Sequence, residues 1–270
     1  MIKKAVFLAG GVGSRFQPLS RFIPKELVLL CRTPLIGYLL EEIYRAGVLE
    51  VVLISSPGKE ALDRYFTYRA GELRLTPAIV YQDKPLGTAD AIWRVREIVG
   101  EEQFFLYYSA DLFLPKVAKR EIIGLWRSQQ LLAAYLETAS PVLSLRSVPI
   151  SDVSRFGIVA IDRFVREGEL ALLSGIVEKP DSAKAPSLLA SIGGMILDKD
   201  VFWAINEVLK SRSKGSEAYL SNALNLLLQE GKSIYGQILL DGEWVDVGTL
   251  TSYPTAFERV VAWELERMFV

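Results

Sequence analysis

The sequence predicts an α/β fold with a Rossmann-like, mixed but mainly parallel sheet flanked by helices. Three observations lead to this prediction. Short apolar runs rich in β-branched and aromatic residues alternate with segments of helical periodicity through the first half of the chain. These runs are continuously apolar, which is typical of strands buried on both faces. Half of the 270 residues are hydrophobic, which is enough for a large core.

The first half of the chain is expected to supply the parallel strands, because each strand-like run is followed by a helical pattern. The predicted strands are 5–9, 51–54, 79–82 and 104–109, and the predicted helices are 35–46, 60–69, 88–99 and 117–129. Ligands of such sheets bind outside the carboxyl ends of the strands. If strands 5–9 and 104–109 are neighbours, the segments that follow them face one crevice.

The second half is expected to mix strands and helices before a closing helix. The predicted strands are 131–136, 142–148, 158–161, 175–178, 190–197, 233–240 and 244–247, and the predicted helices are 201–210, 219–230 and 251–268. No internal repeat, low-complexity tract or clear linker interrupts the sequence. We therefore predict a single domain over 1–270, divided coarsely into residues 1–140 and 141–270, which share one sheet.

Composition excludes several classes of protein. Lys and Arg number 31 against 32 Asp and Glu, so no basic excess points to a nucleic-acid partner. Cys31 is the single cysteine and cannot form an internal disulfide, which fits a reducing cytoplasm. Lys3 and Lys4 before the apolar run 5–9 imitate a signal peptide, but Gly10 ends that run early. No apolar stretch approaches the roughly 18 residues of a membrane helix.

The most informative segment is a glycine-rich loop after the first strand. Residues 8–18 read L-A-G-G-V-G-S-R-F-Q-P, and residues 24–26 read P-K-E. Glycines let backbone N–H groups approach a ligand closely, and Arg15 and Lys25 add positive charge. This combination indicates a loop that wraps a polyphosphate.

Two better-known phosphate loops do not fit this segment. A dinucleotide fingerprint needs a third glycine where Phe16 stands, and a Walker loop needs Gly-Lys-Ser or Gly-Lys-Thr at its end. A plain Gly-rich turn between strand and helix would be the favoured interpretation of Gly10-Gly11 alone. The arginine and the Pro-Lys-Glu that follow make polyphosphate binding the better one.

The whole motif resembles the signature of the sugar-1-phosphate nucleotidyltransferases. Its Pro-Lys-Glu form is most like that of the bacterial UTP–glucose-1-phosphate uridylyltransferases. The resemblance runs from Lys4 to about Phe257 and implies the nucleotide-diphospho-sugar transferase fold. It also implies transfer of a nucleotidyl group from UTP to glucose 1-phosphate, giving UDP-glucose and pyrophosphate, with Mg²⁺ as cofactor. The first half would bind the nucleotide and the second half the sugar.

A second motif, Q-D-K-P-L-G-T-A-D-A over residues 82–91, ends one predicted strand and starts a helix. The Gln82 amide suits the imide edge of uracil or thymine, and Gly87 would let the backbone approach the base. A Pro-Gly turn with Thr88 as an ordinary N-cap is the alternative. The segment resembles the family's base-binding motif, although the family often has His where this chain has Asp90. The resemblance implies these nucleotide-binding residues: Ala9, Gly10, Gly11, Gly13, Gln82 and Gly87.

Two aspartates are candidates for the metal site. Asp111 follows the strand 104–109, and Asp246 lies in W-V-D-V-G-T over residues 244–249. A helix cap or a turn is the alternative role for each. Mg²⁺ in proteins takes one or two carboxylates together with phosphates and waters, and the resemblance implies that both aspartates hold it. The form of the 244–249 motif is closer to the thymidylyltransferase branch. The alternative nucleotide is dTTP, because uracil and thymine present the same edge to Gln82.

The sugar side is predicted from later segments. Glu178 and Lys179 precede Pro180, and an exposed pair of this kind contributes little on its own. The resemblance implies that Glu178 accepts hydrogen bonds from sugar hydroxyls and that Lys179 holds the sugar phosphate. It also implies that Gly157 and Gly193 line the sugar pocket. Many relatives have a Tyr shortly after that second glycine, whereas this chain continues with Gly194, Met195 and Ile196.

The chain contains no histidine, which rules out His-based acid–base catalysis and His metal sites. The implied reaction needs neither, because its nucleophile is a phosphate oxygen whose second pKa is about 6. Catalysis would then consist of positioning and charge neutralisation by Arg15, Lys25 and Lys179.

Two other classes of protein stay open at this point. A non-catalytic relative that binds nucleotide and regulates a partner would explain the departures at Asp90, Gly194 and Met195. A glycosyltransferase on a related sheet expects Asp-x-Asp, which the residues after Asp111 do not supply. For the leading interpretation the partners are small-molecule substrates, with neither nucleic acid nor membrane, in a cytoplasmic homo-oligomer (dimer or tetramer). The closing helix carries Trp263, Leu265, Met268 and Phe269, which would pack on the protein's own core or at a subunit interface.

Overall fold

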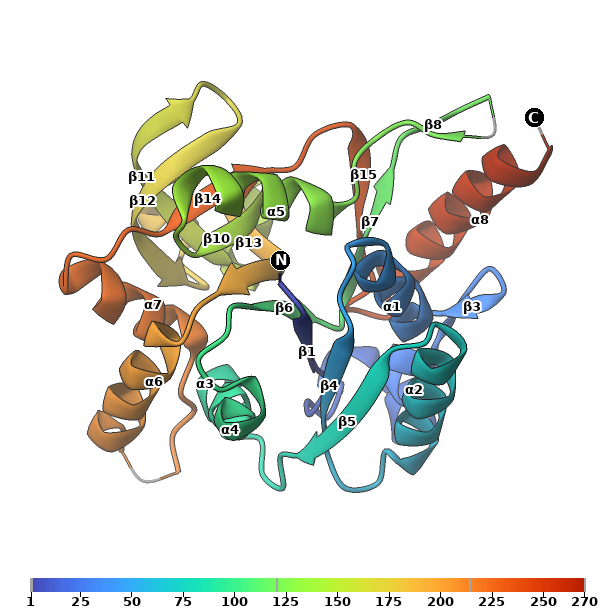
Figure 1. Ribbon diagram of the computed structural model, residues 1–270, viewed down its shortest axis with the longest axis horizontal. Coiled ribbons are helices and arrows are strands. Elements are labelled where there is room, and N and C mark those ends of the chain that lie inside the picture. Colours follow the sequence, from blue (N-terminus) through green and yellow to red (C-terminus); the bar gives the residue numbers. More distant parts are fainter. Residues whose placement is uncertain (1, 120, 214, 270) are drawn as a thin grey trace.

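The computed structural model describes residues 2–119, 121–213 and 215–269, and its centre is one nine-stranded sheet (Figure 1). The strand order is β10-β14-β12-β11-β13-β6-β1-β4-β5. Strands from both halves of the sequence therefore share one sheet, with β6 and β13 joining the halves. The mixed α/β architecture agrees with the predicted class.

Four strands form the parallel part of the sheet: β1 (Lys4–Leu8), β4 (Glu50–Ser55), β5 (Thr76–Tyr81) and β6 (Phe104–Tyr108). Strand β1 pairs in parallel with both β4 and β6. The expectation that strands 5–9 and 104–109 are neighbours is therefore confirmed. Alternate side chains of β1 face two different cores, with Phe7 in one and Val6 in the other. This explains why the strand sequence is continuously apolar.

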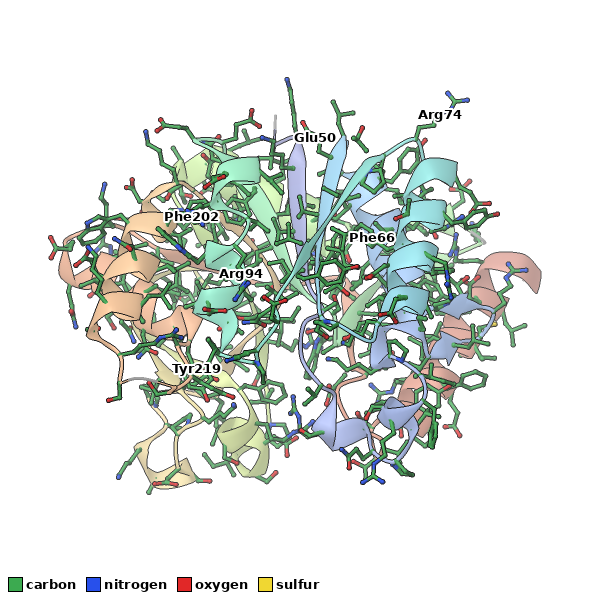
Figure 2. The ribbon with its side chains drawn as sticks, turned by 90° about the horizontal axis from the view of Figure 1, so that it is seen from below. Glu50, Phe66, Arg74, Arg94, Phe202 and Tyr219 are labelled. Carbon is green, nitrogen blue, oxygen red and sulfur yellow. The ribbon has the colours of Figure 1, made fainter. Side chains whose placement is uncertain are left out.

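Helices cover both faces of these strands. Helices α1 (Leu35–Arg45) and α2 (Glu60–Glu72) pack on the Phe7 side, and α3 (Thr88–Trp93) packs on the Val6 side, followed by α4 (Arg96–Val99). Figure 2 shows Phe66 of α2 and Phe202 of α6 (Asp200–Ser211) on opposite sides of the strands. The helix predicted over 88–99 is thus two short helices, because the chain breaks at Arg94 and Val95.

The second half adds mostly antiparallel strands. Strand β13 (Leu189–Leu197) runs antiparallel to β6 and is followed by β11 (Gly157–Arg166), β12 (Leu170–Glu178), β14 (Tyr235–Ile238) and β10 (Val142–Ser147). Strand β10 also pairs antiparallel with β13, so these five strands close on themselves. Only β10 and β14 run parallel to each other among the described pairs of this half. Helices α6 (Asp200–Ser211) and α7 (Leu220–Gln229) lie side by side and cover one face (Figure 1).

The prediction for residues 117–136 was wrong in both of its elements. Strand β7 (Asp111–Pro115) ends before the predicted helix 117–129, and the first part of that segment holds the short strands β8 (Val117–Ala118) and β9 (Glu121–Ile122) instead of a helix. Helix α5 (Arg127–Thr138) replaces the predicted strand 131–136. The continuous apolar run suggested a buried strand, but only Leu131 and Ala134 of it are buried, three residues apart on one helix face. The Gln129 side chain accepts a hydrogen bond from Trp126 N (2.9 Å) and so begins the helix.

A two-stranded ribbon of β7 and β15 (Gly242–Asp246) leaves the main sheet, and its register places Asp111 opposite Asp246. The closing helix α8 (Tyr253–Phe269) follows. Trp263 is buried in the same core as Phe7, whereas Leu265 is exposed. The side chains of Met268 and Phe269 lie outside the described residues.

The remaining elements are short. They are strands β2 (Leu29–Leu30) and β3 (Thr33–Pro34) and the 3₁₀ turns η1 (Ser14–Phe16), η2 (Leu19–Arg21), η3 (Lys25–Leu27), η4 (Ile150–Arg155) and η5 (Ser182–Lys184). Across the described part of the chain, every helix is too short or too polar to cross a membrane.

Candidate active site

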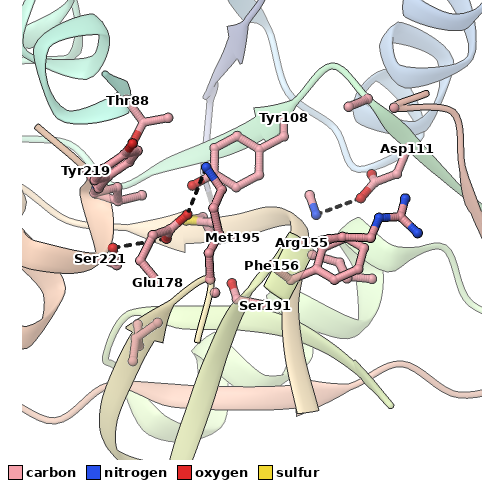
Figure 3. A pocket seen from close by; sticks show the side chains of 18 of the residues that line it. Thr88, Tyr108, Asp111, Arg155, Phe156, Glu178, Ser191, Met195, Tyr219 and Ser221 are labelled. Carbon is pink, nitrogen blue, oxygen red and sulfur yellow. Dashed lines mark hydrogen bonds and ion pairs between the residues drawn. The ribbon is translucent and has the colours of Figure 1, made fainter. Parts of the chain in front are cut away.

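Two adjoining cavities open at the carboxyl ends of β1 and β6. The loop cavity lies between the glycine-rich loop and the 82–91 segment, and Gly10, Lys25 and Gln82 line it. The strand cavity lies over β11 and β13, and Asp111 and Glu178 line it (Figure 3). The residues that line both cavities are Arg15, Thr88, Tyr108, Ala110 and Tyr219. The cavities are therefore two ends of one cleft, joined beside Arg15.

The structure brings most of the predicted site residues to this cleft. Those that line the loop cavity are Gly10, Gly11, Arg15, Lys25, Gln82 and Gly87. Those that line the strand cavity are Arg15, Asp111, Gly157, Glu178, Lys179, Gly193 and Asp246. Ala9 and Gly13 line neither cavity. Ala9 is buried at the end of β1, and Gly13 has a left-handed backbone (φ 67°) before η1.

The shape of the glycine-rich loop is fixed by a residue that sequence reasoning missed. Lys59 Nζ donates to Ala9 O (2.5 Å) and Gly11 O (2.8 Å), and it pairs with buried Glu26 (3.2 Å). These carbonyl groups are held by an ammonium group and do not face a ligand. A negative ligand therefore meets the N–H groups of the loop rather than its carbonyl oxygens. Lys59 is some fifty residues from the loop, and its sequence context carries no signal for this role.

The Lys25 ammonium lines the loop cavity and has a perturbed pKa. Burial lowers its pKa, Glu26 raises it, and Lys59 and Arg15 lower it again. The net effect is a lowered pKa. An anion bound beside Lys25 would favour its charged form, so ligand binding and proton uptake are linked there.

The 82–91 segment packs tightly against the start of α7. Gly87 has φ 96°, and a Cβ there would overlap the Ala218 backbone, so only glycine fits. The Thr88 hydroxyl accepts a hydrogen bond from Leu220 N (2.8 Å), while the N-cap position of α3 is Gly87. Thr88 is therefore not the ordinary N-cap that the alternative interpretation expected. Thr88 ties the 82–91 segment to the second half of the chain.

Asp111 and Asp246 are direct register partners on β7 and β15. Asp111 accepts hydrogen bonds from Gly193 N (2.8 Å) and Trp244 Nε1 (3.0 Å) and pairs with Arg127 (2.7 Å). Asp246 accepts one from Gly248 N (2.8 Å) and pairs with Arg155. Asp246 thus makes a turn, as one alternative expected, but it also faces the strand cavity.

The donor set of this aspartate pair fits Mg²⁺. Both carboxylates lie side by side at the cavity, and a carboxylate offers about four lone-pair sites, so each keeps acceptor capacity beyond its present partners. Hydrogen bonds from Gly193 and Trp244 hold Asp111 as ligating carboxylates are usually held. Among the described residues no group of three or more His, Cys, Asp and Glu gathers anywhere. A pair of oxygen ligands completed by phosphates is the arrangement typical of Mg²⁺.

A fully buried arginine anchors Asp111 from behind. Arg127 pairs with Asp111 through one amino group and with Glu42 of α1 through the other (3.1 Å). Its guanidinium also lies over the Tyr107 ring, 4.6 Å from the centroid. Burial lowers the pKa of Arg127, but Glu42 and Asp111 outweigh that effect and keep it charged. Sequence reasoning missed this network because its members come from α1, β6, β7 and α5.

Arg127 also explains why position 194 is a glycine. Gly194 has φ 109°, and a Cβ there would lie 2.6 Å from Arg127 Cδ. A side chain at that position is therefore incompatible with the buried arginine. Gly193 is equally constrained, because a Cβ there would lie 2.5 Å from Asp111 Oδ1. Met195 is buried and lines the strand cavity.

At the other end of the strand cavity, Glu178 is the register partner of Gly157 at the end of β12. It accepts a hydrogen bond from Ser221 Oγ (3.1 Å), as Figure 3 shows. Lys179 lies 3.9 Å from Glu178 and over the Tyr219 ring, 5.2 Å from the centroid. The pair is thus a loose ion pair at the cavity wall. Ser221 and Tyr219, at the start of α7, were not predicted as site residues.

Comparisons with known proteins identify the family of this chain. The family model described as nucleotidyl transferase matches residues 4–262. The chain belongs to the nucleotidyl transferase family. The match covers the stretch over which the resemblance was expected, and members of this family typically use a divalent metal.

Individual relatives of this nucleotidyltransferase point to one branch. A UTP–glucose-1-phosphate uridylyltransferase of Komagataeibacter xylinus is 32% identical, over 83% of this chain and 82% of that protein. One from Pseudomonas aeruginosa is 30% identical, over 86% of each chain. Among solved structures, a UDP-glucose pyrophosphorylase complexed with UDP-glucose is 26% identical and has a TM-score of 0.86, covering 97% of this chain and 99% of its own.

Proposed function

We propose that this protein transfers the uridylyl group of UTP to glucose 1-phosphate, giving UDP-glucose and pyrophosphate. The observation that carries the proposal is the cleft with two ends joined beside Arg15, which has a polyphosphate loop at one end and a Glu-Lys pair at the other. The uridylyltransferase relatives support UTP and glucose 1-phosphate as the substrates.

In this mechanism the nucleotide occupies the loop cavity. The uracil lies against Gln82 and Gly87, and the triphosphate follows the N–H groups of residues 10–13 toward Arg15 and Lys25. Glucose 1-phosphate occupies the strand cavity, where Glu178 accepts hydrogen bonds from its hydroxyls and Lys179 holds its phosphate. Binding in two adjoining ends of one cleft places the sugar phosphate in line with the α-phosphorus.

The reaction then needs no general base. A phosphate oxygen of the sugar phosphate, largely ionised because its second pKa is about 6, forms a bond to the α-phosphorus. The bond from the α-phosphorus to the bridging oxygen breaks, and pyrophosphate leaves with that electron pair. Arg15 and Lys25 stabilise its charge. Asp111 and Asp246 would hold Mg²⁺, which neutralises phosphate charge when bound.

The test is pyrophosphate release with Mg²⁺ across the four ribonucleoside triphosphates and dTTP, each with a panel of sugar 1-phosphates. We expect release with UTP and glucose 1-phosphate, and Asp111→Asn should abolish it. Nucleotide binding without release for every pair would contradict the proposal and favour the regulatory alternative. Asp162→Asn, at an exposed pair on β11 (Asp162–Arg163, 2.8 Å), is the matched control and should keep full activity.

The thymidylyltransferase alternative rests on the W-V-D-V-G-T form of residues 244–249. Uracil and thymine share the imide edge that Gln82 would contact, so the amide alone does not separate them. The dTTP arm of the same panel decides between the two nucleotides. Release with dTTP in preference to UTP would assign the alternative activity.

A further inference from the structure

We propose that Asp90 is a positioning residue that locks the Gln82 amide so that only a hydrogen-bond acceptor faces the loop cavity. The locked amide selects a nucleobase with an N–H at that point, and so uracil over cytosine. This inference deepens the proposed function and rests on it, since it assumes that the nucleobase occupies the loop cavity.

The first step is the fixed orientation of the amide. Gln82 Nε2 donates to Gly87 O (3.1 Å) and to Asp90 Oδ2 (3.0 Å). A carbonyl oxygen and a carboxylate oxygen accept hydrogen bonds but do not donate them. Rotating the amide by half a turn would place Oε1 against both acceptors and lose both hydrogen bonds. Because both neighbours are acceptors, the nitrogen of the amide faces them and the oxygen points away.

The second step is that the Asp90 carboxylate is itself held. Arg94 Nε lies 3.2 Å from Asp90 Oδ2, and Arg212 lies 3.8 Å from Oδ1. Arg94 is anchored in turn by Tyr81 O (3.1 Å) and by exposed Asp83 (3.5 Å). Two guanidinium groups hold this buried carboxylate in place. Asp90 therefore presents a fixed acceptor to Gln82 Nε2.

The third step is what remains available to a ligand. Both N–H groups of the Gln82 amide are used, so Oε1 is its only free hydrogen-bonding group. No donor in residues 2–119, 121–213 and 215–269 reaches that oxygen, and Gln82 lines the loop cavity. A Cβ at Gly10 would lie 2.9 Å from Oε1, so the glycine leaves the approach to it open.

The bases differ in what they bring to a lone acceptor. Uracil and thymine carry a proton on ring N3, whereas N3 of cytosine carries a lone pair. A cytosine in the same pose would place two acceptors against each other, and a buried polar group without a partner is costly. The lock therefore predicts rejection of CTP without rejection of dTTP.

The test is equilibrium binding of UTP and CTP to the full chain and to two variants. Asp90→Asn can donate as well as accept, so it releases the lock. Asp162→Asn is the matched control, because it makes the same change at an exposed position on β11 that does not contact Arg94 or the Gln82 amide. We expect the unmodified chain and Asp162→Asn to prefer UTP by at least about 100-fold. Asp90→Asn should lower that preference about tenfold.

The outcomes separate the hypotheses. An equal loss of affinity for UTP and CTP in Asp90→Asn would indicate a merely structural role and overturn the proposal. An unchanged preference in that variant would overturn it as well. If the unmodified chain binds no nucleotide, the proposed function fails together with the inference. UTP binding without any preference over CTP would overturn the inference alone.

A second measurement needs no change at position 90. The side-chain amide protons of Gln82 can be assigned by ¹⁵N NMR from the pair of signals that Gln82→Glu removes. Both should exchange more slowly with solvent than those of exposed glutamines, because both are hydrogen-bonded inside the protein. Exchange as fast as in exposed glutamines would overturn the lock.

Discussion

At the scale of single residues, the site contains glycines packed so closely that a larger side chain would displace a neighbour. Gly193 is one such position, because a Cβ there would lie 2.5 Å from Asp111 Oδ1. We expect Gly193→Ala to push the Asp111 carboxylate aside and to lower the rate of transfer about 100-fold. Gly71→Ala, in open space on α2, is the control and should leave activity unchanged. Steady-state kinetics of both variants check this prediction, and an active Gly193→Ala would contradict it.

Arg127 should stabilise the fold in addition to holding Asp111 in place. Replacing it by Met leaves Glu42 and Asp111 buried without their cation, and the loss of one partner of a buried pair costs about 3–5 kcal/mol. Urea denaturation should show that decrease in the free energy of unfolding. Arg163→Met, which breaks an exposed pair with Asp162, should cost at most about 1 kcal/mol. Equal decreases in the free energy of unfolding for the two substitutions would show that the buried network does not contribute this stability.

The lowered pKa of Lys25 predicts a pH dependence with a definite sign. Between this lowered pKa and 10.5, the folded protein binds fewer protons at Lys25 than the unfolded chain does. The contribution of Lys25 to stability therefore rises with pH across that window. Phosphates bound beside Lys25 favour its charged form, so nucleotide binding should take up a proton there and weaken as pH rises.

Calorimetric titration in buffers of different ionisation enthalpy measures that proton uptake directly. Uptake should be present in the unmodified protein and absent in Lys25→Met. Lys184→Met, at an exposed position beside Asp181, should behave like the unmodified protein. Proton release on binding, or uptake that survives in Lys25→Met, would contradict the assignment.

At the scale of elements, the sequence was most informative where a segment decides its own structure. The strand at β1 and the turn at Gly87, where a positive φ favours glycine, follow from the local sequence. The segment 117–136 was misread because its apolar run has no clear period. Its helix is decided by a side-chain cap and by burial against neighbours that are distant in sequence.

Two leucines distinguish helix α5 from the strand that the sequence predicted. A strand buried on both faces would bury both side chains, whereas the helix buries only one. Leu131 is fully buried, whereas Leu136 is 73% exposed on the outer face. We expect Leu131→Ala to cost about 2–5 kcal/mol and Leu136→Ala less than about 0.5 kcal/mol. Thermal or urea unfolding of the two variants measures the difference. Comparable costs would argue against the helix.

At the scale of the whole molecule, the candidate active site forms where the two halves of the chain meet. Strand β13 pairs with β6, the ribbon of β7 and β15 brings Asp111 to Asp246, and Thr88 bonds to the start of α7. Sequence patterns could name the aspartates and the glycines, but not the residues that hold them. Glu42, Lys59 and Arg127 act across the fold, and nothing beside them in the sequence marks that role. The homo-oligomer and the cytoplasmic location stay predictions.

The most direct test of uridylyl transfer is product analysis with UTP, glucose 1-phosphate and Mg²⁺. We predict that UDP-glucose and pyrophosphate appear in equal amounts, and that Asp111→Asn forms neither while still folding. Absence of both products with the unmodified chain, under conditions in which UTP binds, would contradict the account.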